Sequence, residues 1–177
     1  GLEITTIVLT GDEVIADEKY LMRVLIQAPP DDQIFLAVGS GTITDITRYI
    51  SFRTRNPFIS IPTAPSVDGF VSIGAPLVIG GVKQTFNSQG PLAAFADINC
   101  LMQAPNELRA AGFGDIVGKT TSLADWQLGH LLWNEPFDAK IEKRTRNALN
   151  SCIDATDEIA GGSEKGIRLL IDGLLES

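Results

Sequence analysis

The chain has 177 residues, of which 44% are hydrophobic and 20% are charged, and its formal net charge is -8. The apolar content is enough for a core in one large domain or two small ones. The acidic balance argues against a nucleic-acid-binding protein, and no apolar run reaches the roughly 20 residues that a membrane helix needs. Cys100 and Cys152 lack the spacing of a zinc knuckle or a disulfide scaffold, so we expect reduced thiols and a cytoplasmic protein.

Short apolar runs alternate with turn residues through the first half of the chain. Their continuous apolar character predicts buried strands at 4–9, 33–38, 58–61 and 93–96. Between the first three runs, apolar residues recur at helical spacing over 13–28 and 42–52. The alternation of strand and helix predicts a parallel α/β sheet.

A glycine pair interrupts this pattern. Gly80 and Gly81 lie between apolar runs at 71–79 and 82–86. Because neither glycine resists a positive φ, the pair predicts a tight hairpin turn.

Helix-forming residues predominate after Pro105, and Pro136 and a second glycine pair divide them into three or four predicted helices. We therefore expect an α/β domain over 1–105 and a helical domain over 106–177.

The first candidate motif is the sequence GSGTITD at 39–45, which follows a predicted strand and opens a predicted helix. Glycines at such a turn let the backbone approach a phosphate, and a helix N-terminus offers free N–H groups. The third glycine of the dinucleotide fingerprint GxGxxG is absent. The segment is therefore equally compatible with a phosphate site and with a plain turn.

The second motif is PTAPSVDG at 62–69, at the carboxyl end of the next predicted strand. Ligands of parallel α/β sheets bind outside the carboxyl ends of strands, so this loop is expected to face the same crevice. Thr63, Ser66 and Ser72 offer hydroxyl groups, and Asp68 offers an acceptor for a substrate hydroxyl. Composition alone favours the alternative that these residues simply form a turn.

The third motif, AAGFGD at 110–115, leads into a predicted helix at 116–133. An aspartate in the opening turn of a helix is usually a cap, and a metal site would need further histidine or carboxylate ligands. The single histidine, His130, lies too far along a straight helix to share a metal with Asp115. We expect His130 to serve packing or the surface.

Taken together, these motifs resemble the polyol dehydrogenase and dehydroquinate synthase superfamily, in the branch that acts on phosphorylated polyols. The resemblance extends from Thr10 to the C-terminus and is carried by GSGTITDITRY, FISIPTAPSVDGF, APNELRAAGFGDIVGK and SLADWQLG. It implies a dehydroquinate synthase-like α/β fold in which a nucleotide-binding domain precedes an all-helical domain, both incomplete in this chain.

The resemblance also implies an activity. Members transfer hydride reversibly between NAD(H) or NADP(H) and dihydroxyacetone phosphate or sn-glycerol 1-phosphate, at a divalent metal that is zinc or nickel. By motif position, Asp68 would contact the substrate, and Asp115 would be the catalytic residue that contacts both substrate and metal. The residues that would contact the cofactor are Gly41, Thr42, Ile43, Thr44, Asp45, Thr63, Ala64, Pro65, Ser66 and Ser72.

The superfamily completes its metal site with two downstream histidines, which this sequence lacks. We therefore expect a fragment that carries one metal ligand of three and that is metal-poor and inactive by itself. Other readings stay open: glycerol dehydrogenase or another iron- or zinc-dependent polyol oxidoreductase, dehydroquinate synthase, and a non-catalytic nucleotide-binding or subunit-contact module. A homo-oligomer also stays open.

Overall fold

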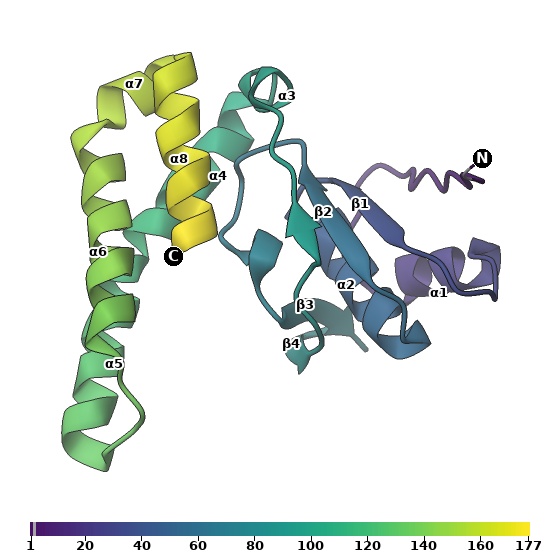
Figure 1. Cartoon of the computed structure of the whole chain (residues 1–177), viewed down its shortest axis with the longest axis horizontal. Helices are drawn as coiled ribbons and strands as arrows, with labels where there is room; N and C mark the ends of the chain where they lie inside the picture. Colours follow the sequence, from purple (N-terminus) through teal and green to yellow (C-terminus); the bar gives the residue numbers. More distant parts are fainter. Residues whose placement is uncertain (2) are drawn as a thin grey trace. The chain divides into compact units, whose positions relative to one another are not determined.

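The computed structural model describes residue 1 and residues 3–177 (Figure 1). Contacts between residues divide the chain into two compact units. We call one the sheet unit, Gly1–Pro62 with Val71–Phe95, and the other the helical unit, Thr63–Phe70 with Ala96–Ser177. The domain division expected at residue 105 stays a prediction.

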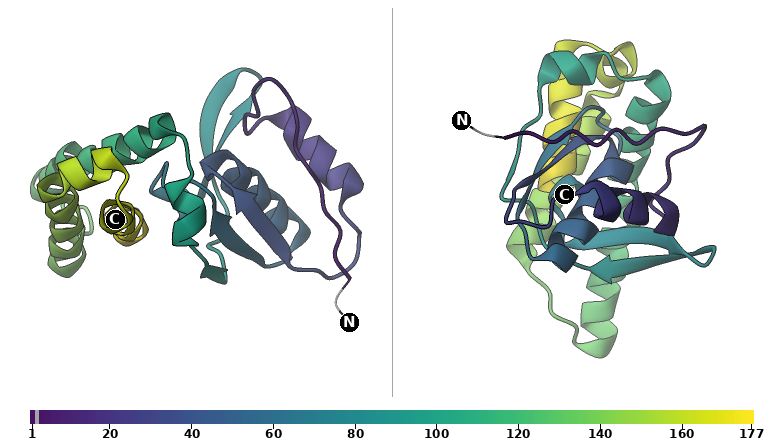
Figure 2. Two further views of the ribbon diagram at one scale, coloured as in Figure 1. Left: turned by 90° about the horizontal axis from the view of Figure 1, so that it is seen from above. Right: turned by 90° about the vertical axis from the view of Figure 1, so that its right-hand side faces the viewer.

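The sheet unit contains the predicted parallel sheet, and Figure 2 shows the ribbon from two further sides. The strands follow one another across the sheet in the order β1 (Phe35–Gly39), β2 (Phe58–Pro62) and β5 (Ala93–Ala94). Helix α2 (Gly41–Thr54) connects β1 to β2 and contacts both of them. The prediction of strand, helix and parallel strand is therefore confirmed.

The expectation that β1 is buried on both faces is wrong. Ala37 is buried, but its neighbours Leu36 and Val38 are exposed. Successive side chains of a strand point to opposite faces of the sheet, so one face of β1 packs inward while the other stays uncovered within the described residues.

The predicted hairpin is confirmed as β3 (Gly74–Ile79) and β4 (Val82–Asn87), which pair antiparallel. Gly80 and Gly81 form the turn with φ of 60° and 77°. Both central residues of a type I′ turn need positive φ, which explains the glycine pair.

Helix α1 (Glu18–Gln27) packs against the hairpin and α2. It begins later than predicted, because the Asp17 carboxylate caps it by accepting from the N–H of Tyr20 at 3.0 Å. The buried core of this unit combines α1, α2 and β3 through Tyr20, Leu21, Ile46, Ile50, Ala75 and Leu77.

The strand predicted at 4–9 is wrong. This segment forms no strand, and Ile4 and Val8 are exposed. A strand requires a neighbouring backbone, but the carbonyls of Val8 and Thr10 instead accept hydrogen bonds from the Arg23 guanidinium, each at 3.1 Å.

The helical unit contains more helices than predicted. Residues 106–177, all of which the structure describes, form five helices because the predicted runs are broken at Gly118 and Ala155. Helix α8 (Glu164–Glu176) packs against helices at 98–102, 106–117, 139–154 and 156–161 (Figure 1). The helices of this unit are α3 (Ile98–Met102), α4 (Asn106–Val117), α5 (Lys119–Trp133), α6 (Ala139–Asp154), α7 (Thr156–Gly161) and α8 (Glu164–Glu176).

None of the helices in the described part of the chain is both long enough and apolar enough to span a membrane.

The core of the helical unit lies between α4, α6, α7 and α8. Its buried members are Ile116, Cys152, Ala155, Ile159, Leu170 and Leu174.

The two cysteines should differ in reactivity. Both are free, but Cys152 is buried, whereas Cys100 is partly exposed. Burial, with a smaller contribution from the charge of Asp172, raises the pKa of the Cys152 thiol to about 11. Only the thiolate attacks disulfide reagents. At about pH 8 we therefore expect Ellman's reagent to titrate Cys100 in the native protein and Cys152 only after denaturation.

The Cys100→Ser variant provides the control. Its native form should react slowly and its denatured form fully, and equal rates for the two forms would contradict the assignment.

Candidate functional site

The first predicted motif forms the N-terminus of α2, directly after β1. Its cap residue, Ser40, makes no side-chain capping hydrogen bond, but its carbonyl accepts from the N–H groups of Ile43 and Thr44 at 3.1 and 3.2 Å. The N–H groups of Gly41 and Thr42 have no acceptor among the described residues. Free N–H groups at a helix N-terminus favour an anion, so this turn can bind a phosphate group.

Gly39 allows the helix to start immediately after the strand. A Cβ atom at this position would lie 2.5 Å from Ile43 Cγ1 and 2.7 Å from Ile43 Cβ. A side chain would therefore push the first turn of α2 away from the end of β1. The packing of α2 against the end of β1 therefore requires a glycine at residue 39, whether or not the turn binds a ligand.

Asp45 has a structural partner. Its carboxylate lies 2.7 Å from the guanidinium of Arg48, which is completely buried and also donates to the Gly74 carbonyl at 2.9 Å. Burial lowers the pKa of Arg48, and the charge of Asp45 opposes this shift. Asp45 therefore compensates a buried cation, and its predicted contact with a cofactor stays a prediction.

The second motif belongs to the helical unit. Ala64, Pro65 and Ser66 are buried, and the N–H of Ser66 donates to the carbonyl of Ala64 at 3.0 Å in a tight turn. Phe70 anchors the end of the segment in a buried cluster with Leu101, Ile167 and Ile171 of α3 and α8. Segment 63–70 is thereby held against the helices.

Gly112 lets α4 approach this segment. A Cβ atom on Gly112 would lie 1.9 Å from the carbonyl oxygen of Pro65, much closer than any real contact. The helix backbone therefore lies directly against the turn. Asp115, three residues further along α4, is brought next to Asp68.

Asp115 lies in the last turn of α4, and the prediction that it opens a helix is wrong. The helix macrodipole disfavours a carboxylate at this end. Asp115 Oδ2 instead accepts a hydrogen bond from the backbone N–H of Asp68 at 2.7 Å. Burial raises the pKa of Asp115; the N–H bond opposes this shift, and the nearby Asp68 carboxylate adds to it. A carboxyl group shifted by burial and by a charged neighbour is typical of functional sites.

Lys119, the first residue of α5, is a member of this cluster that the sequence analysis missed. Its ammonium group forms an ion pair with Oδ2 of Asp68. The signal was present in the sequence, since Asp115 and Lys119 are four positions apart in a helical run, a spacing that places an acid and a base on one face.

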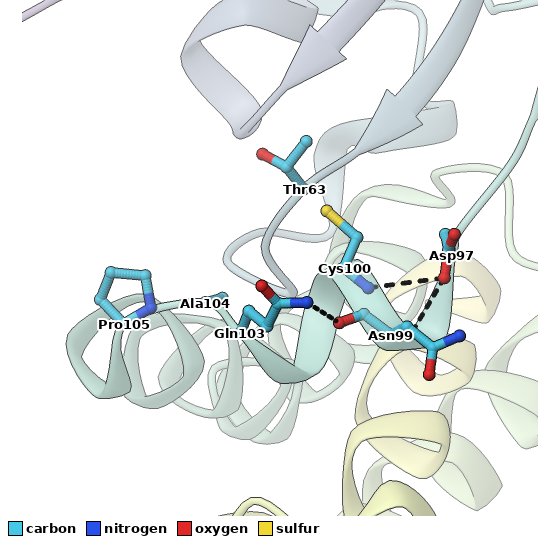
Figure 3. Close-up of a pocket in the computed structure, with 7 residues that line it drawn as sticks. All are labelled: Thr63, Asp97, Asn99, Cys100, Gln103, Ala104 and Pro105. Atoms are coloured by element: carbon cyan, nitrogen blue, oxygen red, sulfur yellow. Dashed lines mark hydrogen bonds between the residues drawn. The ribbon is translucent and has the colours of Figure 1, made fainter.

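Thr63 and Ser72 are two further residues predicted to contact the cofactor, and this role stays a prediction for both. Ser72, in the sheet unit, is exposed, and its hydroxyl donates to the Gly74 carbonyl at 3.2 Å. Thr63 lies in the wall of a hollow of about 420 Å³ in the helical unit (Figure 3). The hollow is lined by Thr63, Asp97, Asn99, Cys100, Gln103, Ala104 and Pro105.

The structure therefore brings Asp68 and Asp115 together, with Lys119 beside them. The turn before α2 belongs to the other unit, so its meeting with these carboxylates across a crevice stays a prediction.

A divalent metal is the other group that the resemblance implies. The described residues bring together no set of three histidine, cysteine, aspartate or glutamate side chains that could hold a metal ion. Asp115 offers one carboxylate, whereas the neighbouring Asp68 is already paired with Lys119. The described residues therefore do not make a metal site by themselves.

His130 has the packing and surface role predicted for it. It is exposed, its Nδ1 lies 2.8 Å from the Glu135 carbonyl, and its ring stacks on Phe137.

The fold and these motifs define a known class. The sequence profile of the iron-containing alcohol dehydrogenase family matches residues 2–105, and the chain belongs to this family.

Its curated relatives include proteins named glycerol-1-phosphate dehydrogenase, with NAD(P)+ in the name. The one from Geobacillus thermodenitrificans is 54% identical over 167 residues, which are 94% of this chain and 41% of that protein. The one from Pyrococcus horikoshii is 37% identical over 142 residues, 80% of this chain and 41% of the relative. The chain thus spans less than half the length of these relatives.

Solved structures support the fold alone. Glycerol dehydrogenase from Schizosaccharomyces pombe superposes with a TM-score of 0.70 at 20% identity, over 94% of this chain and 44% of that one. Sulfoacetaldehyde reductase from Bifidobacterium kashiwanohense in complex with NAD+ gives 0.62 at 16% identity, over 90% of this chain and 47% of the other. The predicted fold class is confirmed.

The close approach at Gly112 gives a stability prediction. We expect Gly112→Ala to lower the free energy of unfolding by about 1–3 kcal/mol, because the methyl group must displace the Pro65 carbonyl. Denaturation by urea measures the change.

Gly114→Ala is the matched control on the same helix. A Cβ atom there would meet nothing within 4 Å, so we expect a gain of about 0.5–1 kcal/mol from helix propensity. A Gly112→Ala protein as stable as Gly114→Ala would refute the packing argument.

Proposed function

We propose that the protein catalyses the NAD(P)-dependent, reversible reduction of dihydroxyacetone phosphate to sn-glycerol 1-phosphate. One ketone, one NAD(P)H and one proton give one secondary alcohol and one NAD(P)+. The observation that carries the proposal is the contact between the Asp68 N–H and the Asp115 carboxylate at 2.7 Å. It joins the two carboxylate residues that the motifs assign to the substrate, and the names of the relatives support the same reaction.

The N-terminus of α2 binds the dinucleotide phosphates in this proposal. The free N–H groups of Gly41 and Thr42 donate to phosphate oxygens, and the positive end of the helix dipole favours their charge. When bound, the nicotinamide supplies or accepts the hydride. Ile43, Thr44 and Asp45 continue the first turns of the helix and shape the site.

The segment after β2 serves the cofactor through its backbone and its hydroxyl groups. Ala64 and Pro65 are buried and have no polar side chain, so they contribute shape and backbone groups. Thr63, Ser66 and Ser72 are assigned to the cofactor by motif position. The free state of both cysteines agrees with a cytoplasmic location, which is part of the proposal.

Asp68 and Asp115 act on the substrate. The Asp68 side chain is 34% exposed, so its carboxylate can accept a hydrogen bond from a substrate hydroxyl. Asp115 holds the Asp68 backbone in place and faces the same substrate. The resemblance also assigns Asp115 to a divalent cation, zinc or nickel, for which the described residues supply this one carboxylate.

The substrate is testable by turnover of the complete protein. We expect dihydroxyacetone phosphate to be reduced with a higher kcat/KM than dihydroxyacetone, with NADH or NADPH, as measured by loss of nicotinamide absorbance. Reduction of the unphosphorylated ketone alone would identify a glycerol dehydrogenase and refute the proposal.

Asp68→Asn tests the assigned role of the carboxylate. We expect kcat/KM for dihydroxyacetone phosphate to fall about tenfold to a hundredfold, because a hydrogen bond to a charged group contributes about 1.5–3 kcal/mol. NADH affinity, followed by energy transfer from tryptophan, should stay near the wild-type value because the free N–H groups of α2 are unchanged. An unaltered kcat/KM would remove Asp68 from the substrate site.

A further inference from the structure

Lys119 contacts Asp68, the residue whose carboxylate the proposed function assigns to the substrate. Its ammonium group pairs with one oxygen of Asp68, Oδ2. The Lys119 side chain is 18% exposed, compared with 34% for the side chain of Asp68. The cation is therefore the more buried partner, and the carboxylate is the more accessible one.

Asp68 is held at two points at the junction between α4 and α5. Its backbone N–H donates to Asp115, and its carboxylate accepts from Lys119. Gly118 lies between α4 and α5 with helical φ and ψ of -56° and -20°, so the two helices follow each other without reversal. Asp115, in the last turn of α4, and Lys119, at the start of α5, therefore both reach Asp68 at this junction.

The contact also changes the charge of the cluster. Asp68 and Asp115 alone would place two negative charges side by side, which would repel each other and an anionic phosphate ester. With Lys119, the three side chains carry one net negative charge when both carboxylates are ionised. Lys119 thus favours both the close approach of the carboxylates and the approach of a phosphorylated substrate.

We infer that Lys119 is a positioning residue: it holds Oδ2 of Asp68 so that the other carboxylate oxygen accepts a hydroxyl group of the phosphopolyol. The inference rests on the proposed function, and it adds a residue to which the resemblance gave no role. A residue that is held both at its backbone N–H and at its carboxylate has fewer orientations to lose when the substrate binds, so the acceptor is preorganised.

The experiment compares variants of the complete protein by steady-state kinetics with dihydroxyacetone phosphate. We expect Lys119→Met to lower kcat/KM about tenfold or more, mainly through KM, and Lys119→Arg to recover most of the loss.

Lys165→Met is the matched control. Lys165 belongs to the same unit and pairs with Glu158 at 2.9 Å, but its side chain is 71% exposed. Its removal should leave kcat/KM unchanged.

A double-mutant cycle separates positioning from a general effect of charge or stability. If Lys119 acts through Asp68, the double variant Lys119→Met with Asp68→Asn should be no worse than Asp68→Asn alone. Calorimetric binding of sn-glycerol 1-phosphate should rank the variants in the same order. Lys119→Gln replaces Lys119→Met in each comparison if the latter does not fold.

The outcomes are distinct. The inference is overturned if Lys119→Met lowers only the unfolding temperature, with kcat and KM unchanged, or if the effects of the two substitutions multiply. If the wild-type protein reduces dihydroxyacetone but not its phosphate, the proposed function fails, and the same cycle with that ketone still decides the role of Lys119. If the wild-type protein neither reduces a ketone nor binds sn-glycerol 1-phosphate, both fall.

Discussion

The contact between the α4 backbone at Gly112 and the carbonyl of Pro65 determines where the candidate site forms. Any side chain at residue 112 would separate the helix from segment 63–70, since even a Cβ atom would lie 1.9 Å from the Pro65 oxygen. The hydrogen bond between the Asp68 N–H and Asp115 is possible only while this approach is kept. Fold stability and site geometry therefore depend on one glycine.

The electrostatics of the site follow from this packing. A carboxylate at the C-terminal end of a helix is unfavourable, and a second carboxylate beside it adds repulsion. Two interactions offset these costs: the Asp68 N–H donates to Asp115, and the Lys119 ammonium pairs with Asp68. An arrangement in which acidic groups are held together against their repulsion is expected where a ligand needs them. The ion pair of Lys165 with Glu158, on the same unit, is by comparison exposed.

Parts of the fold were predictable because local chemistry decided them. Gly80 and Gly81 form the expected turn, since positive φ is a property of the residues themselves. The parallel pairing of β1 and β2 was predictable from strand and helix alternation, because a parallel connection requires a crossover. The segment at 4–9 has the composition of a strand, but a ladder needs a partner, which composition does not reveal.

The third motif shows the opposite case. Gly112 and Gly114 made this stretch resemble a loop before a helix, since each glycine costs a helix about 1 kcal/mol. In the structure both glycines are part of α4. The close packing against Pro65 explains why residue 112 is a glycine. The position of Asp115 at the end of a helix, and not at its beginning, follows from that tertiary contact.

By itself, the sequence determined the class of fold, the glycine turn at the start of α2 and the residue types available to a site, because these depend on local backbone preference and on the period of the apolar pattern. Only the tertiary structure decided that segment 63–70 belongs with the helices, that Asp68 lies against Asp115 and that Lys119 completes the cluster. These contacts join residues that are distant along the chain, and they form only when packing brings two backbones within reach of each other.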